Sequence, residues 1–374
     1  MLDKLKSLFA PERKSATPLL AMYAVGQPYW GQRNYHHFAQ AGFSGNAVAH
    51  RCVRMVAEAA ASVPLLLYKS DRELTAHPFL DLLRRPNPAQ SGRDLIEVVL
   101  SFLLVSGNAY VEMALLDDHP RELLALRPDR IQVIPGPRGW VEAYRYSVGG
   151  AISTLPADQV LHIKLFNPLD DHYGLSPLEA AARALDTHNA AAAWNKAMLD
   201  NAARPSGALV FSGGDGQLSP GQFERLKSEL EQNYQGAAQA GRPMVLEGGL
   251  DWKEMGFSPK DMDFINAKNG AAREIALALG VPPMLLGIPG DNTYANFAEA
   301  HRAFWRQTVI PHLRRLADCL AFQVGRHFED GLTLAPDLDQ VEALSHDRDA
   351  LWARVNAAGF LTAAEKRAAV GYGT

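Results

Sequence analysis

Four side chains near the start of the chain have the chemistry to bind a metal ion: His36, His37, His50 and Cys52. Structural zinc sites hold such ligands at short, regular spacings, which these four do not follow. The first two also lie in a stretch rich in Gly, Gln, Tyr and His that predicts irregular chain. Surface and packing roles are therefore favoured over a metal site, and no cofactor is expected.

A glycine run, Gly213-Gly214-Asp215-Gly216, precedes a predicted helix, as phosphate-binding loops do. A nucleotide-binding loop of this kind continues with Lys and then Ser or Thr, and no such pair follows here. The run is interpreted as an ordinary strand-to-helix turn.

A third cluster, Asp170, Asp171 and His172, has the residue types of general acid–base chemistry, and His162 lies ten residues before His172. The three residues come just before a predicted helix cap, so contacts with helix-end amides or solvent are favoured. The alternative is a cytosolic two-domain α/β enzyme with its site here. No nucleophile-elbow pattern is present, and a protein without enzymatic activity is expected.

The composition describes a folded protein of two or three domains. The chain has 374 residues, of which 47% are hydrophobic and 21% charged. Its formal net charge of −4 argues against a dedicated nucleic-acid binder, which is usually basic. The two cysteines indicate a reducing cytoplasm, and no apolar run approaches the ~20 residues that span a bilayer.

Two long, alanine-rich helices organise the chain. Residues 176–203 predict the first, with Ser176 as its cap and Glu179 completing a capping box. Residues 258–280 predict the second, which Gly280 ends. Neither helix carries a wide apolar stripe, which indicates packing against other copies of the chain; an ordinary helical hairpin in a core is the alternative.

The remaining elements give an α+β fold. Helices and two strands occupy 46–116, with Ser91 as the cap of the last of these helices and Gly107 at its end, and a β-meander follows over 121–165. The insert between the two long helices reads as βαββ. A helix of about thirty residues starts at Asn296, and Pro311 is expected to kink it, because proline removes a backbone donor and clashes with the preceding turn.

Five blocks of sequence stand in the order of a known family. They are HPFLDLLRRPNPAQSGRDLIEVVLSFLLVSGNAYVEM (77–113), QVLHIKLFNPLDDHYGLSPLEAA (159–181), RPMVLEGGLDWKEMGFSPKDMDF (242–264), REIALALGVPPMLLG (273–287) and NTYANFAEAHRAFWRQTVIPHL (292–313). Together they resemble portal proteins, or head–tail connectors, of tailed double-stranded DNA phages. The likeness covers about residues 45 to 330, and the short chain is similar to the compact portals of gene transfer agents.

The resemblance implies a portal-like fold with a mixed α/β wing, a two-helix stem, a small βαββ clip, a long kinked helix and a short helical crown. The expected divisions are an N-terminal tail (1–45), wing (46–175), stem helix 1 (176–204), clip (205–257), stem helix 2 (258–283), tunnel loop (284–296), long wing helix (297–335) and reduced crown (336–374).

The resemblance also implies a ring of about twelve subunits at one vertex of a virion or phage-like particle, assembled in the bacterial cytoplasm. Its implied partners are double-stranded DNA in the channel, the large terminase, the head–tail adaptor protein and the major capsid protein, with no membrane. The residues expected to face DNA from the tunnel loop are Ile288, Pro289, Gly290, Asp291, Asn292, Thr293 and Tyr294. Those expected to dock the terminase and the adaptor from the clip are Gln222, Arg225, Glu229, Trp252 and Lys253.

A mildly acidic subunit suits a conduit, because each neutralised phosphate adds affinity that would hold the DNA in place. Few basic residues are therefore expected to face the bore. Another head–tail connector ring component is a further alternative, which the length of the chain disfavours.

Overall fold

The computed structural model describes residues 31, 33–70, 72–200, 207–211, 221, 224–225, 228, 250–254, 264–289 and 294–371. Within these ranges no helix is both long and apolar enough to cross a membrane.

The body is built around two packed helices, α2 (Ala47–Ser62) and α4 (Gly92–Ser106). Asn46 begins α2 by accepting the N–H groups of Val48 and Ala49. Ser91 and Asp94 form a capping box at the start of α4. Both helices bury a run of Val, Leu and Ala, so their facing sides form the centre of the core.

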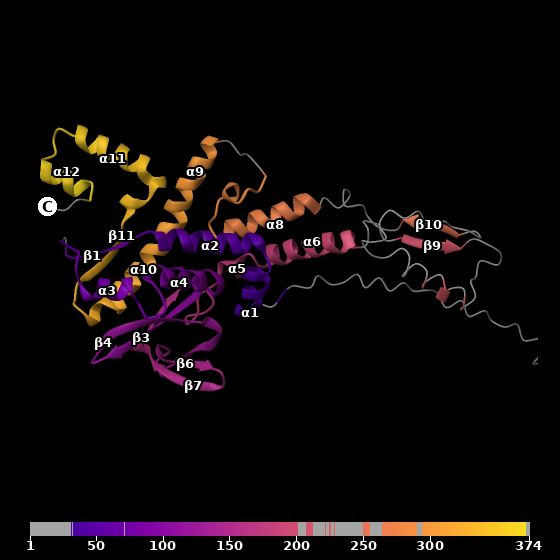
Figure 1. Cartoon of the computed structure of the whole chain (residues 1–374), viewed down its shortest axis with the longest axis horizontal. Helices are drawn as coiled ribbons and strands as arrows, with labels where there is room; N and C mark the ends of the chain where they lie inside the picture. Colours follow the sequence, from indigo (N-terminus) through magenta and orange to yellow (C-terminus); the bar gives the residue numbers. More distant parts are fainter. Residues whose placement is uncertain are drawn as a thin grey trace, which may run out of the picture. The chain divides into compact units, whose positions relative to one another are not determined.

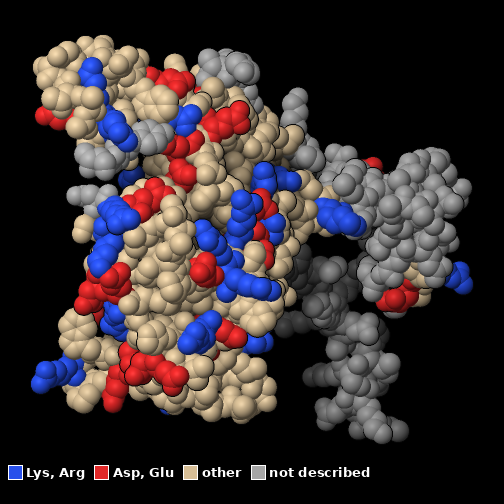
Figure 2. Space-filling view, turned by 60° about the vertical axis from the view of Figure 1, so that its left-hand side comes forward, with Lys and Arg blue, Asp and Glu red and all other residues tan. Residues whose placement is uncertain are grey.

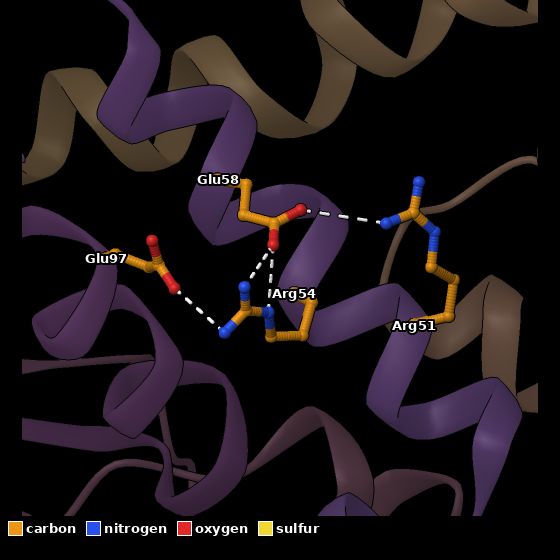
Figure 3. A network of polar contacts seen from close by, with 4 residues as sticks. All are labelled: Arg51, Arg54, Glu58 and Glu97. Carbon is orange, nitrogen blue, oxygen red and sulfur yellow. Dashed lines mark hydrogen bonds and ion pairs between the residues drawn. The ribbon is translucent and has the colours of Figure 1, made fainter. Parts of the chain in front are cut away.

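Ion pairs at the surface also join these two helices (Figure 3). Nε of Arg54 on α2 donates to Glu58 at 2.9 Å, and its Nη1 lies 3.1 Å from Glu97 on α4. Arg51 contacts Glu58 from the other side at 3.6 Å. Because all four side chains are partly exposed, each pair contributes at most about 1 kcal/mol. Of these pairs, Arg54–Glu97 links α2 to α4, and the other two lie within α2.

A three-stranded sheet packs against α4. β3 (Asn108–Leu116) is its centre, with β4 (His119–Leu126) and β8 (Val160–Lys164) antiparallel on either side. The outer edge of β8 does not pair with a further strand in the described chain. Instead, Gln323 and Arg315 donate to the carbonyls of Val160 and Lys164 at 3.0 and 3.2 Å. Side chains thus occupy acceptors that an open edge would present to another strand.

Two further antiparallel sheets complete the body. The first contains β5 (Ile131–Pro135), β6 (Val141–Val148) and β7 (Ala151–Pro156), which form a meander. The meander predicted over 121–165 was too long, because its last strand, β8, pairs with β3 in the other sheet. In the second, β1 (Leu65–Lys69) lies between β2 (Arg72–Leu74) and β11 (Leu332–Pro336). The pairing of Leu67 with Leu334 joins segments that are far apart in the sequence.

The helix expected over 176–203 is α5 (Pro177–Ala180) followed by α6 (Ala182–Asp200), with a turn at Ala181. The capping box expected between Ser176 and Glu179 was wrong. The hydroxyl of Ser176 accepts the N–H of Leu178 and donates to the carbonyl of Val105 at 2.8 Å. Ser176 is buried, and its hydroxyl is used to join the helix start to the end of α4.

The long helix contains the disruption predicted at Pro311. α9 (Tyr294–Phe304) continues through a π-helical turn (Trp305–Val309) into α10 (Ile310–Gln323). The N–H of Ile310 bonds to the carbonyl of Trp305, five residues back. Because Pro311 has no N–H for the carbonyl four residues before it, a wider turn at this point is physically reasonable. The helix begins at Tyr294, two residues earlier than predicted.

Shorter helices complete the described chain. They are α1 (Tyr35–His37), a π-helical segment η2 (Phe38–Ser44), α3 (Pro78–Arg84), α11 (Ser345–Ala357) and α12 (Ala363–Ala369), with 3-10 turns η3 (Pro128–Arg130), η4 (Ala157–Gln159), η6 (Pro283–Leu286), η8 (Gly325–His327), η9 (Leu338–Gln340) and η10 (Glu342–Leu344). Residues 35–44 were expected to be irregular and are helical, because the Asn34 side chain caps their start. Thr362 and Glu365 form a capping box at the start of α12.

Candidate channel and docking surfaces

The two long helices lie side by side as α6 and α8 (Phe264–Ala278) (Figure 1). Trp194 on α6 stacks on Phe264 of α8, with ring centroids 4.1 Å apart and planes 11° from parallel. Leu185 and Ile275 are fully buried toward the body. Ile265 and Leu277, by contrast, are 75% and 78% exposed, so this pair leaves apolar surface that a single chain does not cover.

A buried hydrogen-bond cluster anchors α6 to the body. Nδ2 of Asn46 donates to Oδ1 of Asn189 at 2.8 Å and lies 3.0 Å from Nδ1 of His188. Asn189 in turn donates to the carbonyl of Ala41 at 2.9 Å. Because Nδ2 of Asn46 is a donor, Nδ1 of His188 must be the acceptor, which requires a neutral imidazole. Burial, and next Lys268 of α8, lower the pKa of His188, in agreement with that state.

The second helix leads into the predicted tunnel loop through a tight joint. Gly280, with φ of 67°, follows α8, and its carbonyl accepts the hydroxyl of Thr308 from the π-helical turn at 2.5 Å. Beyond η6, Arg273 of α8 donates to the carbonyl of Pro289. The start of the loop is therefore tied both to the helix pair and to the long helix.

The structure describes few of the residues predicted to face DNA. Ile288 is buried, so in the single chain its side chain anchors the loop, while Pro289 is exposed. Tyr294 is the first residue of α9, which shortens the loop expected to reach residue 296. Gly290, Asp291, Asn292 and Thr293 lie outside the described residues. Their predicted contact with DNA stays a prediction.

The predicted clip is described at a few positions. β9 (Gly207–Phe211) pairs antiparallel with β10 (Leu250–Glu254), which places Trp252 opposite Leu209 and Lys253 opposite Ala208. Arg225 is helical and exposed. Gln222 and Glu229, like the glycine run 213–216, lie outside the described residues, so docking by these side chains stays a prediction.

The sequence did not predict the site around Asn108, at the start of β3, where one side chain makes several hydrogen bonds. Oδ1 of Asn108 accepts the N–H of Gly174 at 2.7 Å and lies 3.1 Å from Nε2 of His162. Its Nδ2 donates to the carbonyls of Ser106 and Gly174. This one side chain joins the end of α4 to the segment that follows β8. The signal in the sequence was a Gly-Asn pair after a helix, which predicts a turn and does not reveal its long-range partner.

The candidate acid–base cluster is used for structure. His162 is stacked on Tyr110, with centroids 4.3 Å apart, and bonds to Asn108. Burial, and to a lesser extent Lys164 and His172, lowers the pKa of His162 to about 3. Such an imidazole is too weak a base for proton transfer near neutral pH. Oδ1 of Asp170 accepts the N–H groups of His172 and Tyr173, bonds that lower its carboxyl pKa.

Three of the four residues considered for metal binding lie in separate surroundings. His37 lies 3.6 Å from Asp186, and Nδ1 of His50 lies 3.0 Å from the carbonyl of Phe43. Cys52 is fully buried in α2, which raises the pKa of its thiol to about 12. Among the described residues no group of three or more His, Cys, Asp or Glu side chains is arranged to hold a metal ion.

Charge on the described surface is mixed. On the face drawn in Figure 2, Lys and Arg alternate with Asp and Glu over the body. That face shows no continuous basic stripe of the kind that tracks a nucleic-acid backbone.

We expect His162 to make the chain sensitive to acid. An unfolded imidazole has a pKa of 6.5, and the folded one has a pKa of about 3. Below pH 6.5 the unfolded state therefore binds more protons than the folded state. The contribution of neutral His162 to the free energy of unfolding is complete above pH 6.5 and is lost progressively as the pH falls toward 3. Urea unfolding between pH 8 and pH 4 measures this slope, which His162→Phe should reduce. An equal slope in the variant would show that His162 is not its source.

Both a family model and individual relatives match most of this chain. The family model described as "Phage portal protein" matches residues 47–371. An uncharacterised protein of Rickettsia bellii (strain RML369-C) is 43% identical over 334 residues, which cover 87% of this chain and 86% of that protein.

Solved structures are similar over nearly the whole chain. A chain in a structure titled "Neck of empty GTA particle computed with C6 symmetry" is 55% identical, with a TM-score of 0.73 over 92% of this chain and 95% of the other. A chain in "Neck of native GTA particle computed with C12 symmetry" is 54% identical, with a TM-score of 0.70 over the same shares. The mixed helix-and-sheet fold matches both.

Proposed function

This chain belongs to the phage portal protein family, and we propose that about twelve copies form a ring around a DNA passage at one vertex of a phage-like particle. The observation that carries the proposal is the 55% identity, over 92% of the chain, to a chain in the neck of a gene transfer agent particle. The C12 symmetry of a second such neck supports the subunit number.

The parts of the chain have separate proposed roles. The helix pair α6 and α8 forms the stem, and its uncovered Ile265 and Leu277 contribute to contacts between neighbouring subunits. The loop after η6, now bounded by α9, points into the channel. The segment that contains β9 and β10 is the clip, and the residues after β11 form a reduced crown.

We propose that the clip binds the large terminase during packaging and the head–tail adaptor protein afterwards, while the body contacts the major capsid protein. The portal itself is passive: ATP hydrolysis by the terminase drives the DNA through the ring. The mixed surface charge supports a conduit, because evenly spaced basic residues would bind phosphates and hold the duplex in place.

Imaging of native particles tests this proposal. The chain should lie at a single vertex and surround a central passage. In solution, an assembled ring of about twelve chains of 40.9 kDa should have a native mass of about half a megadalton. Density at another position would favour a different connector component, and a stable monomer whose unfolding midpoint rises with a small ligand would favour an enzyme.

The tunnel loop gives a functional prediction. Replacement of residues 289–293 by a Gly-Ser segment of equal length should leave ring assembly intact, because the flanking helices and the buried Ile288 are unchanged. Particles that carry this variant should package or retain less DNA, measured as nuclease-protected DNA per particle. Loss of the ring itself would show that the loop has been assigned the wrong position.

A further inference from the structure

The loop that follows β8 holds two large apolar side chains in solvent. Phe166 is 82% exposed and Leu169 is 91% exposed. Isolated apolar residues on a surface need no explanation, but these two are three residues apart on one short loop, residues 165–175.

This 165–175 loop is held by hydrogen bonds at both ends. The N–H of Leu165 donates to the carbonyl of Gly107 at 2.9 Å, and the N–H of Gly174 donates to Asn108 at 2.7 Å. In between, Asn167 accepts the N–H of Leu169 at 3.0 Å, and the hydroxyl of Tyr173 accepts the N–H of Val133 at 2.9 Å. The backbone therefore presents Phe166 and Leu169 in a defined arrangement, with little conformational entropy left to lose on binding.

An apolar groove lies elsewhere on the same chain. Its volume is about 450 Å³, and it is lined by residues of α2, β1, α3 and α4 that include Val63, Leu65, Leu66, Leu80, Leu83 and Ile96. Its volume falls within the range of ~300–1,000 Å³ that encloses a small organic ligand, so it is large enough for apolar side-chain ends.

Charge on the loop and charge at the groove are complementary. Arg84 and Arg93 border the groove, and both are exposed. Arg84 already lies 3.4 Å from Asp81, an exposed pair that contributes at most about 1 kcal/mol. Arg93 has no partner in the described part of the chain, whereas Arg51 and Arg54 of α2 are paired with Glu58 and Glu97 (Figure 3). On the loop, Asp170 and Asp171 directly follow Leu169 and are exposed.

One chain cannot bring these two surfaces together. The loop is attached at Gly107, at the C-terminal end of α4, whereas the groove is lined by Ser91, Gly92 and Ile96 at the N-terminal end. The 15 residues of α4 place these ends about 20 Å apart at 1.5 Å per residue. A contact between two different patches of identical subunits is heterologous, and when the rotation closes it produces a ring.

We propose that Phe166 and Leu169 of one subunit insert into the apolar groove of its neighbour, with Asp170 and Asp171 facing the neighbour's Arg84 and Arg93. This inference rests on the proposed ring and names one contact that closes it. The occupant of the groove is a second copy of this chain.

Crosslinking of the assembled full-length chain tests the contact. Leu169→Cys is combined with Leu83→Cys in a Cys319→Ser background; Cys52 is fully buried and is kept. Because each chain then carries both halves of the contact, a short bismaleimide crosslinker should give a ladder of multimers up to the closed ring. The matched control pairs Leu169→Cys with Phe360→Cys, a position more exposed than Leu83 but outside the groove, and should give no ladder.

A second variant tests the energetic importance of the contact. Phe166→Ala with Leu169→Ala should lower the fraction of chain found in rings by native mass, while its monomer unfolds at the same temperature as the unsubstituted chain. The matched control, Trp140→Ala with Ile152→Ala, removes exposed apolar side chains elsewhere and should leave that fraction unchanged.

The outcomes separate this inference from the proposed function. If rings form normally but give no crosslinked ladder, the proposed contact is wrong and the portal assignment is unaffected. The same holds if rings persist after Phe166 and Leu169 are replaced. Crosslinks from Leu169 to a different protein in native particles would also overturn it. An unsubstituted chain that forms no ring in solution or in particles would count against both.

Discussion

Gly174→Ala should prevent the chain from folding stably. A Cβ on Gly174 would overlap the carbonyl oxygen of Gly107 and would lie 2.7 Å from the backbone N of Leu165. All of these are backbone atoms, which cannot rotate away as a side chain does. The same shift would break the bonds of Gly174 with Asn108. We expect a loss of about 4 kcal/mol or more in the free energy of unfolding, which is a large share of the stability of an ordinary protein.

Gly359→Ala is the matched control for Gly174→Ala. A Cβ at Gly359 meets no atom within 4 Å, and its backbone does not lie in the left-handed region. Its effect should therefore stay within about 0.5 kcal/mol. Urea unfolding and the yield of soluble chain measure both variants. A Gly174→Ala chain as stable as the Gly359→Ala chain would show that the close approach of Gly107 and Gly174 does not limit packing.

Local signals in the sequence predicted the elements well. Ser91 before α4 and Gly107 after it are caps whose partners lie within a few residues, and the structure confirms both of them. Pro311 belongs to the same group, because the missing N–H acts on its own helix. The family and its fold were also predicted, from ordered blocks of residues.

Long-range contacts were not predicted, because the partner of a polar residue is set by the tertiary fold. Ser176 has the sequence context of a capping box, but the end of α4 lies close enough to take its hydroxyl. Asn108 reads as a turn residue, and its bonds with Gly174 depend on how β3 pairs with β8. The cluster around Asn46 likewise unites segments more than 140 residues apart.

This difference bears on the candidate sites. The cluster around Asn46 and the site around Asn108 are built from buried polar contacts, which fix the directions in which α6 and the 165–175 loop leave the body. The surfaces expected to act on partners consist instead of side chains that the single chain leaves uncovered. Their partners belong to the assembly, so neither the sequence nor one folded chain identifies them directly.

Gly280→Ala should weaken the joint between α8, the loop that follows η6 and the long helix. Gly280 has a φ of 67°, and an alanine in the left-handed region costs about 1–2 kcal/mol. Its Cβ would also lie 2.5 Å from Oγ1 of Thr308, and overpacking of this kind costs about 1–3 kcal/mol more. The expected total is therefore about 2–5 kcal/mol, measured by urea unfolding of the isolated chain.

Thr308→Ala separates the two contributions. Alone, it removes the hydrogen bond to the carbonyl of Gly280 and should cost about 1 kcal/mol. In its presence, Gly280→Ala should cost only the ~1–2 kcal/mol of backbone strain, because the clashing side chain is gone. Additive effects of the two substitutions would contradict the clash. The backbone strain should also affect function, because Gly280 sets the direction in which the chain leaves α8 for the loop. Rings built from Gly280→Ala chains should therefore hold their loops less uniformly than rings built from Thr308→Ala chains. They should also retain less DNA.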